Sequence, residues 1–204
     1  KRDIVRLAML GNGIAVYAFR YRWEGPHGPV HVGVMAQDLL GDERTAAAVV
    51  LTAPPAPFVP VQWHGRPIVG VLVCHSGQSV ETDLAPLLAL EGPIFDLITE
   101  KPYVEQQSML DDMEPKGLHQ YWKTEYLPGL SNGYLDAFRA GALRATSPLS
   151  FSVIFHIGGA LNDLDDDDGA VGNRDARYIS GFSGVWTPDS PPDEHIAWVR
   201  DAWE

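Results

Sequence analysis

Residues 149–156 read Leu-Ser-Phe-Ser-Val-Ile-Phe-His, and this octapeptide carries the clearest strand pattern of the chain. Successive side chains of an extended backbone point to opposite faces, so the residues fall into two groups. One group is Leu149, Phe151, Val153 and Phe155, and the other is Ser150, Ser152, Ile154 and His156. The alternation predicts a β-strand with two unlike faces, one of them rich in bulky apolar side chains.

Other segments on both sides of this octapeptide supply further elements. Tyr178–Trp186 is predicted as a strand, and the β-branched content of Pro67–Cys74 predicts a buried strand. Arg44–Thr52 is an apolar run that ends at the prolines of residues 53–57, which stop any regular element. Tyr103–Met113 and Tyr121–Leu127 fit short helices or ordered loops.

Three segments have a helical pattern. Ser79–Leu90 is compatible with a helix despite Pro86, and Ser131 or Asn132 caps a second helix. The second helix places Leu135, Phe138 and Ala142 on one face, and the closing helix, Pro191–Trp203, carries a stripe of Ile196, Val199 and Trp203. Strands separated by irregularly placed helices predict an α+β fold with a largely antiparallel sheet, covered by helices on one face.

The first 41 residues differ in composition from the rest. They carry five Lys and Arg against three Asp and Glu, a net charge of +2, whereas residues 42–204 have a net charge of −14. Ile14–Trp23 and Val30–Met35 flank the Gly-Pro-rich turn 24–29, which predicts a β-hairpin. Because two strands bury little surface, this appendage needs a host or an oligomer. We therefore expect two domains, 1–41 and 42–204.

Composition excludes several classes of protein. A net charge of −12 argues against general affinity for nucleic acid or anionic membranes. No apolar run is long enough to cross a bilayer, and the first ten residues lack the apolar core of a signal peptide, so we expect a cytoplasmic protein. The single cysteine, Cys74, excludes an internal disulfide and a multi-thiolate metal site, and its apolar surroundings favour a core residue.

Catalytic and metal motifs are scarce. The chain has no phosphate loop, no Gly-x-Ser-x-Gly and no His-Glu-x-x-His, and Gly11-Asn-Gly13 lacks the third glycine of a dinucleotide fingerprint. The acidic run 163–169 does not fit a calcium loop, because placing Gly169 at the sixth position puts Leu164 at the first. We expect an exposed connection there and no metal site.

Hydroxyl and imidazole side chains could form a nucleophile and base. Ser150, Ser152 and His156 share one strand face, with Ser180 on another strand. Nothing in the sequence arranges them as a triad, and polar residues on a strand face commonly meet solvent. Aromatic residues such as those of Tyr121-Trp-Lys123 fit a core, a flat conjugated cofactor or a ring-shaped substrate.

From about Gly41 to Glu204 the ordered motifs resemble the substrate domain of berberine bridge enzyme-like, FAD-linked oxidases. The matching segments follow one another across about four-fifths of the chain. They are Leu51–Pro60, His64–Val69, Leu84–Leu87, Pro102–Gln107 with Leu110-Asp111, Gly117–Lys123, Ser147–Ser150, His156–Ala160, Asn173–Tyr178, Trp186 and Ile196–Arg200.

The resemblance implies a sheet with helices on one side and the roof of a flavin-bound cavity on the other. It implies oxidation of a substrate alcohol or C–H bond by hydride transfer to FAD, with reoxidation by dioxygen. Residues facing the substrate pocket are then expected to be Ser152, His156, Ser180, Ser183, Tyr121 and Lys123, with Gly158 and Gly159 near the cofactor.

Two departures from the family pattern bear on function. The family's flavin domain precedes the matching region, so we expect this chain to need a separate flavin-binding domain or chain and not to hold FAD unaided. The strand 178–186 offers Ser180 and Ser183 but no acidic residue, so no proton acceptor is evident there.

The first 41 residues resemble a different family, the intramolecular chaperone domain of phage tail-fibre and endosialidase proteins. The segments concerned are Lys1–Ile4, Gly13–Tyr17, Phe19–Trp23 and Val32–Gln37. This resemblance implies an alternative function for the chain, that of a non-catalytic assembly module, and predicts a trimer.

Overall fold

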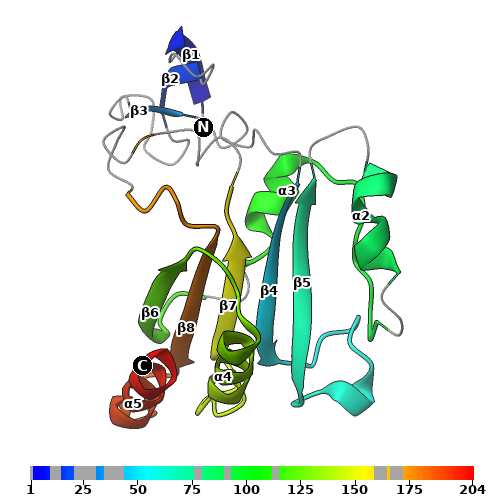
Figure 1. Ribbon diagram of the computed structural model, residues 1–204, viewed down its shortest axis with the longest axis vertical. Helices are drawn as coiled ribbons and strands as arrows, with labels where there is room; N and C mark the ends of the chain where they lie inside the picture. Colours follow the sequence, from blue (N-terminus) through cyan, green and yellow to red (C-terminus); the bar gives the residue numbers. More distant parts are fainter. Residues whose placement is uncertain are drawn as a thin grey trace. The chain divides into compact units, whose positions relative to one another are not determined.

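Two sheets form, one in each of two units of the chain (Figure 1). The computed structural model describes residues 2–9, 15–20, 31–34, 44–75, 80–89, 93–111, 115–158, 165 and 172–204. One unit comprises Lys1–Glu43 and Gly158–Asp175, and the other comprises Arg44–Ile157 and Ala176–Glu204.

The smaller unit contains a three-stranded antiparallel sheet. Its strands are β1 (Arg2–Met9), β2 (Ala15–Arg20) and β3 (His31–Val34), in the order β1-β2-β3. Val16 pairs with Val34 and Phe19 with His31, so the strand pairing predicted for the N-terminal hairpin is confirmed where the structure describes it. Its predicted turn, 24–29, lies outside the described residues, and β1 is a strand that the sequence pattern did not reveal.

The larger unit contains a five-stranded sheet in the order β5-β4-β7-β8-β6. Every pair of neighbouring strands is antiparallel, which confirms the predicted α+β fold with an antiparallel sheet. The strands are β4 (Arg44–Thr52), β5 (Pro67–His75), β6 (His119–Leu127), β7 (Phe151–His156) and β8 (Tyr178–Trp186).

Helices of the larger unit begin and end close to the predicted positions. They are α2 (Val80–Leu88), α3 (Tyr103–Ser108), α4 (Asn132–Ala142) and α5 (Pro192–Trp203), with a 3-10 turn, η2 (Val61–Trp63). Ser131 caps α4, because its side chain accepts a hydrogen bond from the Tyr134 amide at 3.1 Å. Pro192 opens α5, where its missing N–H costs nothing.

Helices α4 and α5 pack on one face of the five-stranded sheet, which we call the helix face. Its core joins Phe138 of α4 and Trp198 of α5 to Ile154 of β7 and Phe182 of β8. The Phe182 ring lies 5.2 Å from that of Phe138 and 6.2 Å from that of Trp198. Directly paired residues share a face, so Val50, Ser152, Phe182 and Lys123 form one row of the helix face across four strands.

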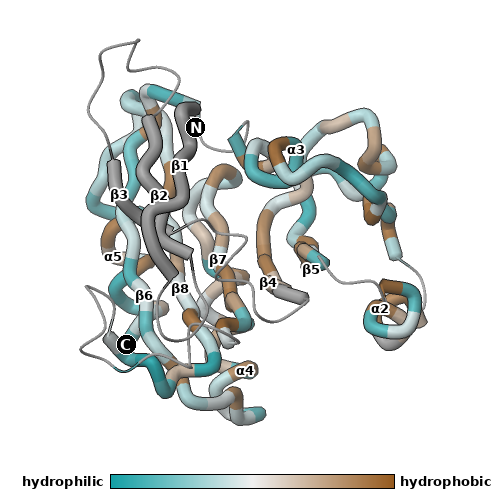
Figure 2. Tube along the Cα trace, turned by 90° about the horizontal axis from the view of Figure 1, so that it is seen from above, coloured by the Kyte–Doolittle hydropathy of each residue, from teal (hydrophilic) through white to brown (hydrophobic). Residues whose placement is uncertain are grey.

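Two sequence-based assignments are wrong. Pro67–Cys74 is a strand, but it lies at the edge of the sheet, where Val69 is 68% exposed. Tyr121–Leu127 is neither helix nor loop, because it belongs to β6 and pairs with β8 along its whole length. Figure 2 shows the reason for the second error, since β6 is coloured mostly as hydrophilic whereas β4 and β7 are mainly hydrophobic. An edge strand with one solvated face lacks the apolar content that marks a central strand.

Candidate functional site

The sheet face away from α4 and α5, which we call the opposite face, is built from three rows of paired residues. At its β4–β5 end, Leu51 and Ile68 pack in a second core with Ala53 and Val59. The strand registers define rows that run from β6 to β5. The first row contains Tyr126, Ile179, Phe155, Ala47 and Leu72. The middle row contains Thr124, Gly181, Val153, Val49 and Gly70, and the third contains Trp122, Ser183, Phe151, Leu51 and Ile68. The two outer rows carry the large side chains, and the middle row carries the small ones.

Glycine is required twice in the middle row. A Cβ atom on Gly181 would lie 2.8 Å from Cγ2 of Thr124, and one on Gly70 would lie 3.1 Å from Cγ1 of Val49. Both distances are shorter than ordinary carbon contacts, because the side chains of Thr124 and Val49 already fill the space beside the two glycines. The middle row is therefore a closely packed apolar strip, and the rows on either side of it carry aromatic side chains.

An aromatic pair spans β8 on this face. The rings of Trp122 and Phe151 meet edge to face at 5.4 Å, and both residues pair directly with Ser183, which lies between them. Ser183 is buried and its hydroxyl has no hydrogen-bond partner in the described part of the chain. Trp122 itself is 43% exposed, so the pair offers an accessible indole surface.

Ionisable groups are rare on the opposite face. Among its described strand residues, Tyr126 and Cys74 carry the titratable side chains, and they belong to the two edge strands, β6 and β5. The exposed aromatic side chains of this face, Trp122 and Phe155, can therefore contact a flat ring. The strand β8 contributes no carboxylate to it, as the sequence indicated.

Most of the predicted pocket residues lie on the helix face instead. Ser152 and Ser180 are buried there, and their hydroxyls have no hydrogen-bond partner among the described residues, although strand polarity suggested that such residues meet solvent. They sit on neighbouring strands, where Ser152 pairs with Phe182 and Ser180 pairs with Ile154. The two serines are thus close to each other but belong to the core under α4 and α5.

Two other predicted residues, Tyr121 and Lys123, contact α5 through interactions that involve a cationic side chain. The Arg200 guanidinium donates a hydrogen bond to the Tyr121 hydroxyl at 3.2 Å, and the Lys123 ammonium lies 4.1 Å from the centre of the Trp203 ring. The hydrogen bond to Arg200 lowers the pKa of Tyr121 and raises that of Arg200. These contacts fasten the end of α5 to the edge strand β6.

The remaining predicted residues are spread over different places. His156 is at the end of β7, with its ring 5.5 Å from that of Tyr178 on the helix face. Ser183 is the predicted residue that the opposite face contains. Gly158 follows β7 at intermediate exposure, and Gly159 lies outside the described residues.

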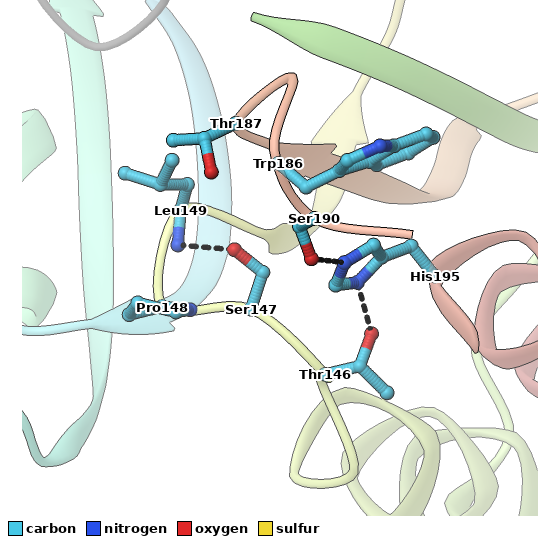
Figure 3. Close-up of a pocket in the computed structure, with 8 residues that line it drawn as sticks. All are labelled: Thr146, Ser147, Pro148, Leu149, Trp186, Thr187, Ser190 and His195. Carbon is cyan, nitrogen blue, oxygen red and sulfur yellow. Dashed lines mark hydrogen bonds between the residues drawn. The ribbon is translucent and has the colours of Figure 1, made fainter. Parts of the chain in front are cut away.

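A pocket of about 210 Å³ lies at the start of α5, away from these residues (Figure 3). His195 is 4% exposed and its ring stacks on that of Trp186 at 4.9 Å and 21°. Thr146 Oγ1 lies 2.8 Å from His195 Nδ1, and Ser190 Oγ lies 2.8 Å from Nε2. Near the pocket, a hydrogen bond from the Thr187 side chain lowers the pKa of Asp189.

This constellation was not predicted from the sequence. Its one local signal is the position of His195, which precedes the buried Trp198 and Val199 by three and four residues on α5. Such spacing places a histidine on the buried stripe of a helix, where its ring nitrogens need partners. Thr146 lies 49 residues away, so only the fold reveals the pair.

Metal and membrane sites receive no support from the described residues. Within them, no group of three or more His, Cys, Asp or Glu side chains is placed to hold a metal ion. Nor does any described helix have the length and apolar character needed to cross a membrane.

The fold is shared with solved structures of berberine bridge enzyme-like proteins. BBE-like #28 from Arabidopsis thaliana is 11% identical with a TM-score of 0.58, and it matches 79% of this chain and 35% of its own. Berberine bridge enzyme from Eschscholzia californica is 13% identical with a TM-score of 0.59, over 79% and 33%. GilR, an oxidoreductase that catalyses the terminal step of gilvocarcin biosynthesis, is 18% identical with a TM-score of 0.56, over 78% and 33%.

These likenesses establish a common fold, and the chain spans about a third of the length of each of these structures. No protein-family profile and no curated protein matches the sequence. The resemblance of residues 1–41 to a tail-fibre chaperone domain finds no support in these comparisons.

Proposed function

We propose that residues 42–204 are the substrate domain of an FAD-linked oxidoreductase of the berberine bridge enzyme-like type. The observation that carries the proposal is the opposite face of the sheet, an apolar strip bounded by aromatic residues in a fold shared with those enzymes. In this proposal the opposite face is the roof of the cavity in which the flavin ring and the substrate lie.

The residues of the opposite face suit a planar ring. Trp122, which is 43% exposed, and Phe151 beside it supply aromatic contact for such a ring. The described strand residues of this face carry no cationic side chain that would neutralise a diphosphate. We therefore propose that a separate flavin-binding domain or chain holds the rest of FAD.

The proposed reaction divides its tasks between cofactor and protein. When bound, FAD would supply the hydride acceptor for oxidation of a substrate alcohol or C–H bond, with dioxygen as final electron acceptor. The side chains of the opposite face would position the substrate ring and exclude water. The residues Ser152, Ser180, Tyr121 and Lys123 would act indirectly, by holding the sheet against α4 and α5.

Ring binding can be tested on this chain with riboflavin and FAD. Both ligands carry the same ring, so we expect similar weak affinities if the chain contacts the ring alone. The Trp122→Leu variant should weaken both about fivefold, because an aromatic contact contributes about 1 kcal/mol. Flavin fluorescence quenching gives the dissociation constants.

The matched control is Trp203→Leu, which removes an indole of similar exposure, 38%, beside Lys123. Its flavin affinity should equal that of the unaltered chain. Equal weakening in the two variants, or the absence of saturable quenching, would count against the proposal. A much tighter complex with FAD than with riboflavin would show that this chain also recognises the diphosphate part.

A further inference from the structure

The pocket beside α5 contains a hydrogen-bonded series of three side chains from three segments. Ser190 follows β8, His195 lies in the first turns of α5, and Thr146 precedes β7. Ser190 and Thr146 sit on either side of the His195 ring, each with its hydroxyl oxygen 2.8 Å from a ring nitrogen (Figure 3). None of these residues belongs to the opposite face.

The arrangement determines what each hydroxyl can do. A neutral imidazole donates from one nitrogen and accepts at the other. When His195 Nδ1 donates to Thr146, Nε2 is left to accept the hydroxyl proton of Ser190. Stacking on Trp186 and burial hold the ring in this orientation. A serine, a histidine and an orienting acceptor in this order are the parts of an activated nucleophile.

The surroundings leave space for a small acyl group. The pocket of about 210 Å³ is below the range of sites for drug-sized ligands, which begins at about 300 Å³. Leu149 and Pro148 give it apolar wall, and the buried Trp186 Nε1 has no hydrogen-bond partner among the described residues. Helix α5 begins two residues after Ser190, and its N-cap, Pro191, makes no side-chain capping bond. Because Pro191 and Pro192 have no N–H, the first amide donors of α5 are those of Asp193 and Glu194.

We propose that Ser190 is an activated nucleophile that hydrolyses small esters in this pocket. Ser190 Oγ attacks the ester carbonyl carbon while its proton passes to His195 Nε2. The C–O bond to the alcohol then breaks, and the leaving alkoxide takes that proton from Nε2. Water, with His195 again accepting a proton, releases the acid and restores the Ser190 hydroxyl. This activity is independent of the proposed flavin-linked function and uses a different part of the fold.

The test uses the intact chain and two probes, a fluorophosphonate that labels activated serines and p-nitrophenyl acetate. Mass spectrometry of tryptic peptides should place the phosphonyl group on Ser190 of the folded protein, and unfolding in urea should abolish the labelling. The His195→Gln variant should lower the labelling rate and the ester hydrolysis about 100-fold, as expected for loss of a general base.

Further variants separate the catalytic role from a structural one. Thr146→Val should lower the rate about tenfold, whereas Thr146→Ser, which keeps a hydroxyl, should restore most of it. Ser108→Ala removes an exposed serine hydroxyl of α3, and it should change neither reaction. Thermal unfolding confirms that each variant is folded under the assay conditions.

Two results would overturn the proposal. One is an unlabelled Ser190 in the folded wild-type chain, which needs no variant to interpret. The other is a folded His195→Gln variant that is labelled, or hydrolyses the ester, at the wild-type rate. Because neither measurement involves flavin, they leave the proposed oxidase function untouched.

Discussion

The two faces of the five-stranded sheet are built from the same strands but are packed in contrasting ways. On the helix face the sheet contributes the small residues Ser152, Ser180 and Gly184 beside the ring of Phe182, and the helices contribute Phe138 and Trp198. On the opposite face the strands themselves carry the bulk, and several of those side chains remain partly exposed.

The contrast teaches that polarity alone does not say which face of a strand is buried. A Cβ on Gly184 would lie 3.0 Å from Cγ2 of Val199, so small sheet residues let α5 approach closely. Close packing requires large groups to meet small ones, as Val199 of α5 meets Gly184 of β8 here. The bulky side of β7 is left for another ring-shaped partner, which is the use that we propose for it.

The largest predicted difference in stability is between the substitution of a phenylalanine on the helix face and of one on the opposite face. Phe182→Ala removes a ring packed between Phe138 and Trp198, and we expect a loss of about 3–5 kcal/mol in the free energy of unfolding. Phe155→Ala, on the opposite face and 37% exposed, should cost about 1 kcal/mol or less. Urea unfolding measures both, and equal losses would show that the two faces are equally packed.

The second prediction concerns how closely α4 packs against α5, measured by the change in stability when a glycine of α4 is replaced by alanine. Gly141→Ala places a methyl group 3.1 Å from the Ala202 Cβ and 3.2 Å from a Phe182 ring carbon, so we expect destabilisation of about 1–3 kcal/mol. Gly133→Ala in the same helix meets nothing closer than 4.0 Å and should stabilise by about 0.5–1 kcal/mol through helix propensity. Thermal unfolding gives the sign, and stabilisation by both substitutions would contradict tight helix packing.

A third effect compares buried serines with and without partners. The Ser150 hydroxyl donates to the Val185 carbonyl and accepts from the Val185 amide, so Ser150→Ala should cost about 1–2 kcal/mol. Ser180→Ala removes an unpartnered hydroxyl and should be neutral or stabilise by about 1 kcal/mol. Chemical unfolding of the two variants measures these changes in stability. A large loss of stability in Ser180→Ala would show that the Ser180 hydroxyl has a hydrogen-bond partner.

The smallest effect concerns the contact of Tyr121 with Arg200 at the edge of the helix face. The lowered pKa of Tyr121 means that its ionised form contributes stability above the ordinary tyrosine pKa of about 10. That contribution is lost as pH falls through the lowered pKa. Absorbance titration near 295 nm should show a low-titrating tyrosine that Tyr121→Phe removes and Arg200→Gln shifts upward. Tyr134→Phe, the control, should leave that step in place.

Much of the fold could be predicted from local patterns. The alternation in 149–156 predicted β7, the segment 178–186 was predicted as the strand that is β8, and Ser131 marked the start of α4. The edge strand β6 escaped prediction because its polar and aromatic residues fit several structures, and pairing with β8 decides among them. The same argument applies to Val69, whose exposure depends on β5 having a single partner strand among the described elements.

The candidate sites were less predictable than the fold. Ser180 and Ser183 were both predicted to face the substrate pocket, but they lie on different faces of β8, and Ser183 is the one on the opposite face. His195, Ser190 and Thr146 carry no shared motif, because residues 146 and 195 meet only when the turn before β7 reaches the start of α5.

The amino-acid sequence by itself determined the strands with strong alternation, the helices with clear caps, the α+β class and the acidic character of residues 42–204. These are local properties, set by side-chain period, backbone preference and charge. The tertiary structure alone decided which sheet face receives α4 and α5, and which hydroxyls meet an imidazole. Those outcomes depend on the complementary volumes and distances of residues far apart in the chain, which no local pattern records.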